Sequence, residues 1–531
     1  MNKLLKNKYY LYLTEFFAGM AVMAVELGAS RLLAPYFSSS QIVWTIIIGT
    51  IMIAMALGNV YGGRSADKNP NPDRLYMRII IAAIWIALIP VVGKYIILLI
   101  TGLLVVTVNT NLLIWAAFIA CMVIFVFPLF LLGTVTPSLA KYTMSSLDDN
   151  GKTVGALGAC NTIGSIIGTF LPTFVTIPKV GTAVTFLIFS GVLLVLGLIY
   201  FAAEKKKLIP CIIAVVIFVL ASIFGNINGF AFWDDNKTYE GESVYNYILI
   251  KEDEESIRLS TNVLFGVQSV KMKQKGISGK YFEYDMAAPF MAGLSEDNAA
   301  NILVLGNCAG NYATICREYF PHSDVEGVEI DEKITQLAEK YFDMPKEVAV
   351  TTYDGRAYLN VIDKKYDVIM VDAYQDITIP FQMSSVEFFT LVKEHLNKNG
   401  VMVVNLNMHN EEEGSINSYL CDTIANVFDN VYTIDVEGWS GRELFASENG
   451  DMLKCLEEGI SGIEDAGLKS LMEYVSEGLT GYEKGGYILT DDNAPVELLG
   501  MKVIDSIIKD ELVYYKKVFK EEGFKGLLNS Y

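Results

Sequence analysis

Seven apolar runs, each long enough to cross a membrane, crowd into the first 225 residues of this 531-residue chain. A bilayer span needs about 20 mostly apolar residues. The runs cover approximately residues 9–33, 42–61, 79–100, 112–139, 154–177, 181–203 and 208–225. The first run is too long, and too poor in small residues at its end, for a removable signal peptide. The sequence therefore predicts a multi-pass α-helical membrane domain over residues 1–225, with the lipid bilayer as a partner.

The formal charges divide the chain at the same place. Residues 1–225 hold 15 Lys and Arg against 7 Asp and Glu, whereas residues 226–531 hold 26 against 53. Two halves that differ in this way exclude a single soluble globule, a fibrous protein and a disordered chain. The acidic half would repel phosphate groups, so we expect no nucleic-acid partner. It suits a cationic partner, although acidic surfaces also serve solubility alone.

Basic residues between the apolar runs predict an orientation. Twelve Lys and Arg lie at the N-terminus and in the second, fourth and sixth loops, whereas the first, third and fifth loops hold only Lys179. The positive-inside rule therefore predicts a cytoplasmic N-terminus. Seven crossings from that start would put the acidic half outside the cell. A re-entrant run at residues 112–139, which contains Pro128 and Pro137, would put it inside, so its side stays open, leaning outside.

The cysteines and histidines predict neither a metal site nor a disulfide framework. The 7 Cys are scattered without a C-x-x-C pair, and the 3 His lie far apart in the sequence. Metal sites and disulfide scaffolds both require characteristic spacings, which are missing here.

From about residue 240 the pattern changes to short strands and helices. Residues 245–252, 257–260 and 266–273 read as strands, which predicts a small β-region within a linker segment of residues 226–295. We then expect strands at residues 302–305, 325–329, 348–352, 366–372 and 401–406, and helices at residues 311–319, 332–341 and 385–396. Alternating strands and helices predict a doubly wound, mostly parallel sheet, so residues 296–531 should form an α/β domain.

Polar features follow three successive strands of this predicted sheet. The segment Gly306-Asn307-Cys308-Ala309-Gly310 follows the first strand and opens a helix, where glycines let a ligand approach the backbone. Glu329 ends the second strand and can accept hydrogen bonds from both hydroxyls of a ribose, and Asp354-Gly355 follows the third, suited to an adenine edge. Ligands of such sheets bind beyond the carboxyl ends of the strands. The ordered set favours a nucleoside site over packing glycines and helix-capping acids.

The fourth strand and its surroundings carry a resemblance to a known family. The motifs that carry it are Tyr284-Asp285-Met286, the glycine segment, Val328-Glu329-Ile330-Asp331, Asp354-Gly355-Arg356, Asp372-Ala373-Tyr374 and Thr490-Asp491-Asp492-Asn493-Ala494-Pro495-Val496-Glu497. The acidic half resembles a spermidine synthase, an aminopropyltransferase on the class I methyltransferase (Rossmann-like) fold. Over nearly all of residues 10–500, the chain resembles the membrane-fused bacterial branch of that family.

The resemblance implies transfer of an aminopropyl group from decarboxylated S-adenosylmethionine to putrescine or a related amine, without a metal. By resemblance the catalytic residues are Asp372, Tyr374 and Asp376; the cofactor-binding residues are Gln268, Gly306, Gly310, Glu329, Asp354 and Gly355; and the substrate-binding residues are Tyr284, Asp285, Gln375 and Asp492. The nucleophile is an amine that must first lose a proton, and carboxylates beside it can position it and accept that proton.

Three positions depart from the family's pattern. Ala309 stands where the glycine loop usually carries an acid, Gln375 stands where the soluble enzymes carry a second acid, and Asp285 replaces a His. Alternative functions therefore stay open: a methyltransferase that uses intact S-adenosylmethionine, or a non-catalytic membrane protein that binds nucleosides or polyamines. A homodimer is likewise left open.

Overall fold

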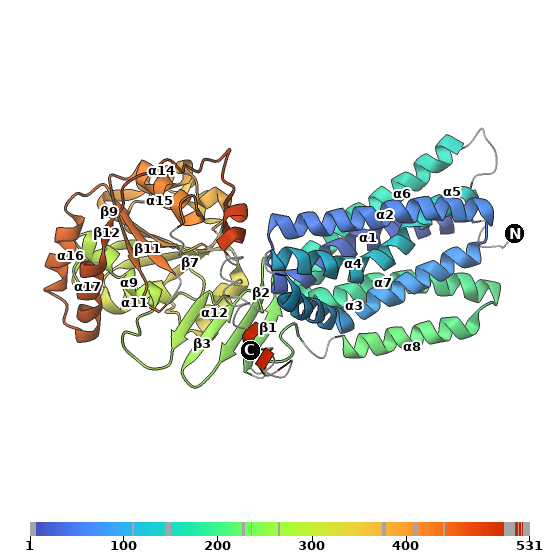
Figure 1. Ribbon diagram of the computed structural model, residues 1–531, viewed down its shortest axis with the longest axis horizontal. Helices are drawn as coiled ribbons and strands as arrows, with labels where there is room; N and C mark the ends of the chain where they lie inside the picture. The colour runs from blue at the N-terminus through green and yellow to red at the C-terminus, as the bar shows by residue number, and fades with distance from the viewer. Residues whose placement is uncertain are drawn as a thin grey trace.

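The computed structural model describes residues 7–108, 111–143, 150–225, 229–234, 236–263, 266–373, 379–406, 412–438, 441–503, 516–518, 520–521 and 523. The N-terminal half is a bundle of long helices, and the C-terminal half is an α/β unit beside one end of that bundle (Figure 1).

The helices of the bundle follow the predicted apolar runs. They are α1 (Lys8–Phe37), α2 (Gln41–Lys68), α3 (Pro72–Thr107), α4 (Leu112–Gly133), α5 (Val135–Thr143), α6 (Asn150–Leu171), a π-helical turn (Pro172–Thr176), α7 (Ile177–Glu204) and α8 (Leu208–Phe224). The described helices include five continuous stretches that are long and apolar enough to cross a membrane. The last of these stretches covers 54 residues, and Gly181 within it has a non-helical φ of 79°.

The proline-containing run at residues 112–139 passes through the whole bundle. It divides into α4 and α5 at Thr134, which itself keeps a right-handed helical backbone. At the end of α5, Lys141 forms an ion pair of 2.8 Å with Asp67, which lies at the end of α2 farthest from the α/β unit. The described residues therefore show no re-entrant turn in this run.

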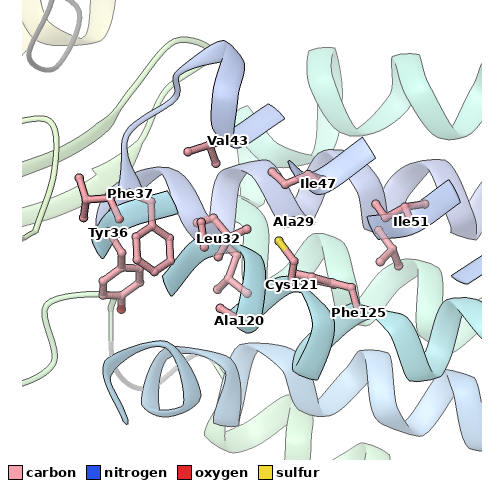
Figure 2. Close-up of a cluster of buried hydrophobic side chains, with 14 of the residues drawn as sticks. Ala29, Leu32, Tyr36, Phe37, Val43, Ile47, Ile51, Ala120, Cys121 and Phe125 are labelled. Atoms are coloured by element: carbon pink, nitrogen blue, oxygen red, sulfur yellow. The ribbon is translucent and has the colours of Figure 1, made fainter. Parts of the chain in front are cut away.

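Small residues bring α1 and α6 into direct backbone contact. A Cβ atom on Gly164 would lie 2.0 Å from the carbonyl oxygen of Phe16, and one on Gly168 would lie 2.1 Å from that of Met20. Elsewhere in the bundle, α1, α2 and α4 pack through larger apolar side chains such as Phe37, Ile47 and Phe125 (Figure 2). Glycines at helix contacts of this kind allow helices to approach more closely than larger residues permit.

We expect Gly164→Ala to destabilise the bundle by about 1–3 kcal/mol, because the added methyl group would force α1 and α6 apart. Gly158→Ala in the same helix is the matched control, since a Cβ there meets no described atom within 4 Å. Thermal unfolding of the purified protein in detergent measures both. Equal effects of the two substitutions would contradict the close contact.

The α/β unit contains an eight-stranded sheet in the order β12-β10-β11-β9-β8-β5-β6-β7. Its strands are β5 (Asn301–Leu305), β6 (Asp324–Glu329), β7 (Ala349–Thr352), β8 (Tyr366–Val371), β9 (Leu396–Leu406), β10 (Asn430–Asp435), β11 (Arg442–Ser447) and β12 (Thr480–Gly481). β5 to β9 are parallel, which confirms the predicted doubly wound sheet. β10, β11 and β12, which were not predicted, add an antiparallel edge.

Alternating side chains of the central strands bury both faces of this sheet. Leu303, Leu305 and Val371 pack on one face with α14 (Val386–Glu394) and α15 (Ile416–Val427). Ile302 and Val304 pack on the other face. That face is covered by α10 (Ala287–Met291), α11 (Asn311–Tyr319), α16 (Met452–Ile460) and α17 (Ala466–Gly478). Because successive strand residues point to opposite faces, continuous runs of Val, Ile and Leu are what a doubly covered sheet requires.

A small antiparallel sheet connects the two halves. It consists of β1 (Lys237–Glu242), β2 (Tyr247–Glu252), β3 (Ser256–Ser260) and β4 (Ser269–Met272). On β2, Ile248 and Ile250 pack toward α12 (Glu332–Tyr341), whereas Tyr247 and Leu249 pack against Ala231 and Phe230 on the opposite side. The small sheet is therefore buried on two faces, one toward the α/β unit and one toward the helical bundle.

Hydrogen bonds tie the bundle to the small sheet. The Val263 amide donates to the Pro35 carbonyl at the end of α1 (2.8 Å), and Thr182 of α7 donates through its amide to Glu242 (2.8 Å). The Arg31 guanidinium also donates to the carbonyl oxygen of Val244. The β1–β2 turn therefore has a fixed position between the bundle and the α/β unit.

Candidate active site

A cavity of about 190 Å³ lies at the carboxyl ends of β5, β6, β7 and β8. One wall is the sheet edge, and the other comes from the small sheet, through Tyr245, Asn246 and Gln268. Of the predicted cofactor-binding residues, Gln268, Gly306, Glu329, Asp354 and Gly355 line it, as does the predicted catalytic Asp372. The predicted placement of ligands at this edge of a parallel sheet is thus matched by a cavity in the structure.

The glycine segment after β5 owes its shape to close backbone contacts. Gly306 has a φ of 87°, and a Cβ there would lie 2.4 Å from the carbonyl oxygen of Asp372. Gly310 has a φ of 76°, and a Cβ there would lie 2.5 Å from the sulfur of Met344. Gly310 is not among the described cavity-lining residues, so its role is to let the segment turn into α11.

Glu329 is held in place by the backbone of two neighbouring turns. Its carboxylate accepts hydrogen bonds from the amides of Cys308 (2.8 Å) and Asp331 (3.0 Å). Burial raises the pKa of Glu329 to about 7, against the lowering effect of these amides. Each carboxylate oxygen has a further lone pair, so both can still accept a hydrogen bond from a hydroxyl group of a ligand in the cavity.

Asp354 has a structural role besides its place in the cavity wall. Its side chain caps α13 (Gly355–Leu359) by accepting a hydrogen bond from the Ala357 amide (2.8 Å). The next residue but one, Arg356, makes a two-pronged ion pair with Asp491, with both distances 2.7 Å. Asp354 therefore both caps a helix and lines the cavity.

Asp372 lies at the end of β8 between two hydrogen-bond donors. The Tyr281 hydroxyl donates to one carboxylate oxygen (2.9 Å), and the Asn405 amide donates to the other (3.0 Å). Burial raises the pKa of Asp372 to about 7, and the charge of Glu329 adds to this rise. Asp372 is thus poised to gain or lose a proton near neutral pH.

The described lining of the cavity is acidic. It contains Glu329, Asp354 and Asp372, and no Lys, Arg or His side chain lies in that described lining. Carboxylates in a buried setting are stabilised by nearby positive charge. The cavity is therefore suited to a cationic ligand.

Several predicted site residues lie away from this cavity. Tyr284 is buried with its hydroxyl facing the Glu437 amide (3.4 Å), Asp285 is fully buried outside the described cavity lining, and Asp492 is exposed on the surface. Tyr374, Gln375 and Asp376 lie outside the described residues. The described part of the predicted catalytic set is thus Asp372 alone.

Ala309 has a packing reason for not being an acid. Its side chain lies in an apolar cluster with Ile248, Ile250 and Leu337, between the small sheet and α12. A carboxylate at this position would be buried against hydrocarbon, which costs several kcal/mol, on the order of the desolvation of an unpaired ion. An alanine in place of the family's acid therefore allows the small sheet to pack against α12.

Two residues that contact Asp372 were not predicted from the sequence. Tyr281 belongs to α9 (Tyr281–Tyr284), and Asn405 lies near the carboxyl end of β9, beside β8. Asn405 could have been found, because a polar residue at the end of the strand next to Asp372 shares the edge where ligands bind. Tyr281 could not, because the orientation of a four-residue helix decides which of its tyrosines faces the sheet.

Comparisons with known proteins show which families this chain is similar to. Residues 282–436 match the family described as "Spermine/spermidine synthase domain". A protein of Bifidobacterium longum (strain NCC 2705), "Probable polyamine aminopropyl transferase", is 51% identical over 350 residues, which are 63% of this chain and 78% of that protein. A polyamine aminopropyltransferase of Vibrio vulnificus (strain CMCP6) is 25% identical over 303 residues, 54% of this chain and 98% of its own. The crystal structure of a probable spermidine synthase from Corynebacterium glutamicum covers 47% of this chain and 95% of its own, at 20% identity and a TM-score of 0.35.

The parallel sheet with its antiparallel edge defines a class I methyltransferase-like fold, and the acidic cavity lies at its strand ends. Within that class, the chain belongs to the polyamine aminopropyltransferase family.

Proposed function

We propose that this protein is a membrane-attached aminopropyltransferase that transfers an aminopropyl group from decarboxylated S-adenosylmethionine to putrescine or a related amine. The observation that carries the proposal is the pair of carboxyl groups in one cavity, Glu329 at the end of β6 and Asp372 at the end of β8. Both substrates are cations, through a sulfonium and through ammonium groups, and the cavity lining supplies negative charge.

Asp372 is the proposed proton acceptor. An alkylammonium group has an ordinary pKa of about 10.4, so the acceptor amine arrives protonated and must lose a proton before it can attack. Asp372, with its pKa near 7, can take that proton while Tyr281 and Asn405 hold its carboxylate in place. The amine nitrogen then forms a bond to the carbon beside sulfur, the carbon–sulfur bond breaks, and its electron pair stays on sulfur.

Glu329 and Asp354 are the proposed residues for the nucleoside of the donor. Glu329 would accept the ribose hydroxyls, and Asp354 would face the adenine from the end of β7. Gly306 supports the position of Asp372 beside this nucleoside site, because its missing side chain lets the β5 and β8 ends lie in contact. These roles account for the three strand-end features as a single binding surface.

The test is a reaction with defined substrates. Purified protein incubated with putrescine and decarboxylated S-adenosylmethionine should release methylthioadenosine and form spermidine, both measured by mass spectrometry. Methylated product from intact S-adenosylmethionine, without spermidine, would select the methyltransferase alternative. Nucleoside binding without any product would select the non-catalytic alternative.

We expect Glu329→Gln to weaken the binding of methylthioadenosine by about 1.5–3 kcal/mol for each hydrogen bond lost to the charged acceptor. A ribose hydroxyl donates best to the ionised carboxylate, so wild-type affinity should rise as the pH increases through about 7, and this dependence should weaken in the variant. Calorimetry from pH 6 to 8, about one unit on either side of the Glu329 pKa, measures both effects.

The control for this substitution is Glu326→Gln on the same strand. Glu326 lies outside the described cavity lining, where it accepts hydrogen bonds from the Tyr366 hydroxyl (2.7 Å) and the Lys364 ammonium (3.0 Å). Its replacement should leave nucleoside affinity and its pH dependence unchanged. Equal losses in both variants would argue against Glu329 as the ribose ligand.

Membrane attachment is proposed from the surface of the helical bundle. Large apolar side chains on its outer faces are mostly exposed, as with Met52 (65%), Leu103 (61%) and Phe174 (64%). Soluble proteins rarely expose apolar patches of such extent, whereas a lipid environment favours them. The 54-residue apolar stretch is far longer than one crossing needs, so its kink at Gly181 would divide it into two crossings.

An orientation follows from the positions of the basic residues. Lys206 pairs with Asp73 (3.6 Å) and Lys141 with Asp67 (2.8 Å), so the basic loops lie together at the end of the bundle opposite to the α/β unit. By the positive-inside rule we propose that this basic end is cytoplasmic and that the α/β unit lies on the outer side.

Thiol labelling of intact cells tests this orientation. Glu413→Cys places a thiol on the exposed surface of the α/β unit, and Lys205→Cys places one at the basic end. With a membrane-impermeant reagent, the first should label in intact cells above the unsubstituted background, and the second only after lysis. The reverse result would place the cavity in the cytosol, together with the adenosyl donors.

A further inference from the structure

The β1–β2 turn, residues 243–246, lies between the helical bundle and the candidate active site, and its Tyr245 and Asn246 line the cavity (Figure 1). We propose that Arg31 of α1 is a positioning residue for the donor nucleoside and that it acts through this turn. The inference rests on the proposed function, in which Glu329 accepts the ribose hydroxyls of the donor. It gives the helical bundle a part in substrate binding besides membrane attachment.

Two residues of the bundle hold the chain at alternate positions beside the turn. The Arg31 guanidinium donates a hydrogen bond to the carbonyl oxygen of Val244. Thr182 donates to the Glu242 carboxylate through its amide (2.8 Å) and its hydroxyl (2.5 Å). Glu242 is the last residue of β1, so the bundle holds the chain on both sides of Ser243.

The turn itself is closed by hydrogen bonds of Ser243. Its hydroxyl oxygen accepts from the amides of Tyr245 (3.1 Å) and Asn246 (2.9 Å), and its own amide donates to the Asn246 carbonyl (2.8 Å). Serine hydroxyls stabilise tight turns in this way. A displacement of Val244 is therefore passed on to Asn246, because the residues between them are bonded to one another.

On its other side the turn is bonded to Asp331 at the start of α12. The Ser243 hydroxyl and the Asn246 side-chain amide (3.0 Å) donate to one carboxylate oxygen of Asp331, which is 2% exposed. The other oxygen accepts from the Lys333 amide (3.0 Å) and caps the helix. The Asp331 amide in turn donates to the carboxylate of Glu329 (3.0 Å). Hydrogen bonds therefore connect the turn to the proposed ribose acceptor.

The charge of Arg31 fits this junction. It is the one Lys or Arg residue between positions 9 and 37, in a helix that is otherwise mostly apolar. Charged residues in such helices are costly and usually face a partner. The carboxylates of Glu242 and Asp331 supply the nearby negative charge. Arg31 thus lies beside both acids that hold the turn, one bonded to the bundle and one to the α/β unit.

We expect Arg31→Met to weaken the binding of methylthioadenosine at least about fivefold, the lower end of typical coupling between sites. The KM for the donor should rise in parallel. The kcat at saturating donor and the KM for putrescine should change little, because the path ends at Glu329 and not at Asp372. Arg31→Lys keeps the charge and one donor, so it should recover part of the loss. Calorimetry and turnover of the full chain in detergent measure these effects.

Arg78→Met is the matched control for Arg31→Met. Arg78 is a half-buried arginine near the start of α3, where it donates to the Ser65 hydroxyl (2.8 Å). Its replacement removes a guanidinium from the bundle without touching the turn. The affinity for methylthioadenosine and the donor KM should therefore stay at the wild-type values.

A double substitution tests whether Arg31 acts through the turn. Ser243→Ala removes the hydroxyl that closes the turn and bonds to Asp331, and Ser243 lies outside the described cavity lining. Ser243→Ala should weaken nucleoside binding, and Arg31→Met should then add little further loss. Effects of residues in one hydrogen-bond network are not additive, whereas independent effects add. Additive losses would contradict the shared path.

Hydrogen exchange of the ligand-free protein gives a readout that needs no turnover. The Tyr245 and Asn246 amides are held by Ser243, and the Asp331 amide is held by Glu329. Amide exchange in peptides that cover residues 243–246 and 329–333 should be faster in Arg31→Met than in the wild type. Arg78→Met should leave it unchanged.

The outcomes separate this inference from the proposed function. Absence of aminopropylated product with intact nucleoside binding overturns aminopropyl transfer, while the binding data still decide the role of Arg31. Wild-type affinity and exchange in Arg31→Met would overturn the inference, and so would an equal loss in Arg78→Met. A lower kcat with an unchanged donor KM would mean that Arg31 only supports the fold, and would overturn it too.

Discussion

Replacing Asp372 with Asn is expected to lower kcat by roughly 10²- to 10⁴-fold while the protein still binds methylthioadenosine. The amide keeps the size of the side chain and an oxygen for the Asn405 donor, but it cannot accept the proton of the amine. In the wild type, kcat/KM should rise as the pH increases through about 7, because only the ionised Asp372 is a base. This rise should be lost in the variant.

Asp367→Asn on the same strand is the matched control for Asp372→Asn. Asp367 lies near the amino end of β8, where its carboxylate accepts hydrogen bonds from the Asn301 amide (2.9 Å) and from Asn397 (2.6 Å). Its replacement should change stability but not the pH profile. Full turnover by Asp372→Asn, or an equal loss in Asp367→Asn, would remove Asp372 from the mechanism.

The second large effect is expected from Gly306→Ala, which should destabilise the α/β unit by about 2–5 kcal/mol. Its φ of 87° is strained for any residue with a side chain, and the new Cβ would lie 2.4 Å from the Asp372 carbonyl oxygen. The end of β8 must then move away from β5, and Asp372 moves with it. The free energy of unfolding, measured by chemical denaturation, and the turnover rate should therefore fall together.

Gly279→Ala separates backbone strain from the clash. Gly279 has a φ of 73°, but a Cβ there meets no described atom within 4 Å. This variant should lose only about 1–2 kcal/mol and keep its turnover. If both variants lost the same stability, the contact between the glycine segment and β8 would not matter.

The core of the α/β unit was open to prediction because it obeys local rules. Ile302–Leu305 and Val401–Leu406 are short apolar runs, and such runs between turn residues and amphipathic helices specify buried parallel strands. Glu329 was found for the same reason, since a polar residue that ends an apolar strand lies at the ligand-binding edge, whereas Asp372 was found through the family resemblance. The positions of Tyr374, Gln375 and Asp376 stay predictions.

The surroundings of Asp372 were not predictable in this way. Glu443 lies within β11, and its place beside Asn405 depends on the antiparallel register between β11 and β9. Asp285 was predicted to bind substrate by its place in a motif, whereas the helix direction turns it into the interior. Both depend on contacts between segments that are far apart along the chain, which no local pattern encodes.

The double burial of β2 has a consequence for producing the α/β unit without the helical bundle. Ile248 and Ile250 pack toward the α/β unit, whereas Tyr247 and Leu249 pack toward the bundle. These four side chains are therefore buried on both faces of the strand. Without the helical bundle, the face of β2 that carries Tyr247 and Leu249 would lie closer to water, where polar residues are usual. A fragment that starts at residue 229 would keep Phe230 and Ala231 but lose Tyr36 of α1, against which Phe230 packs, so we expect it to expose apolar surface and to aggregate.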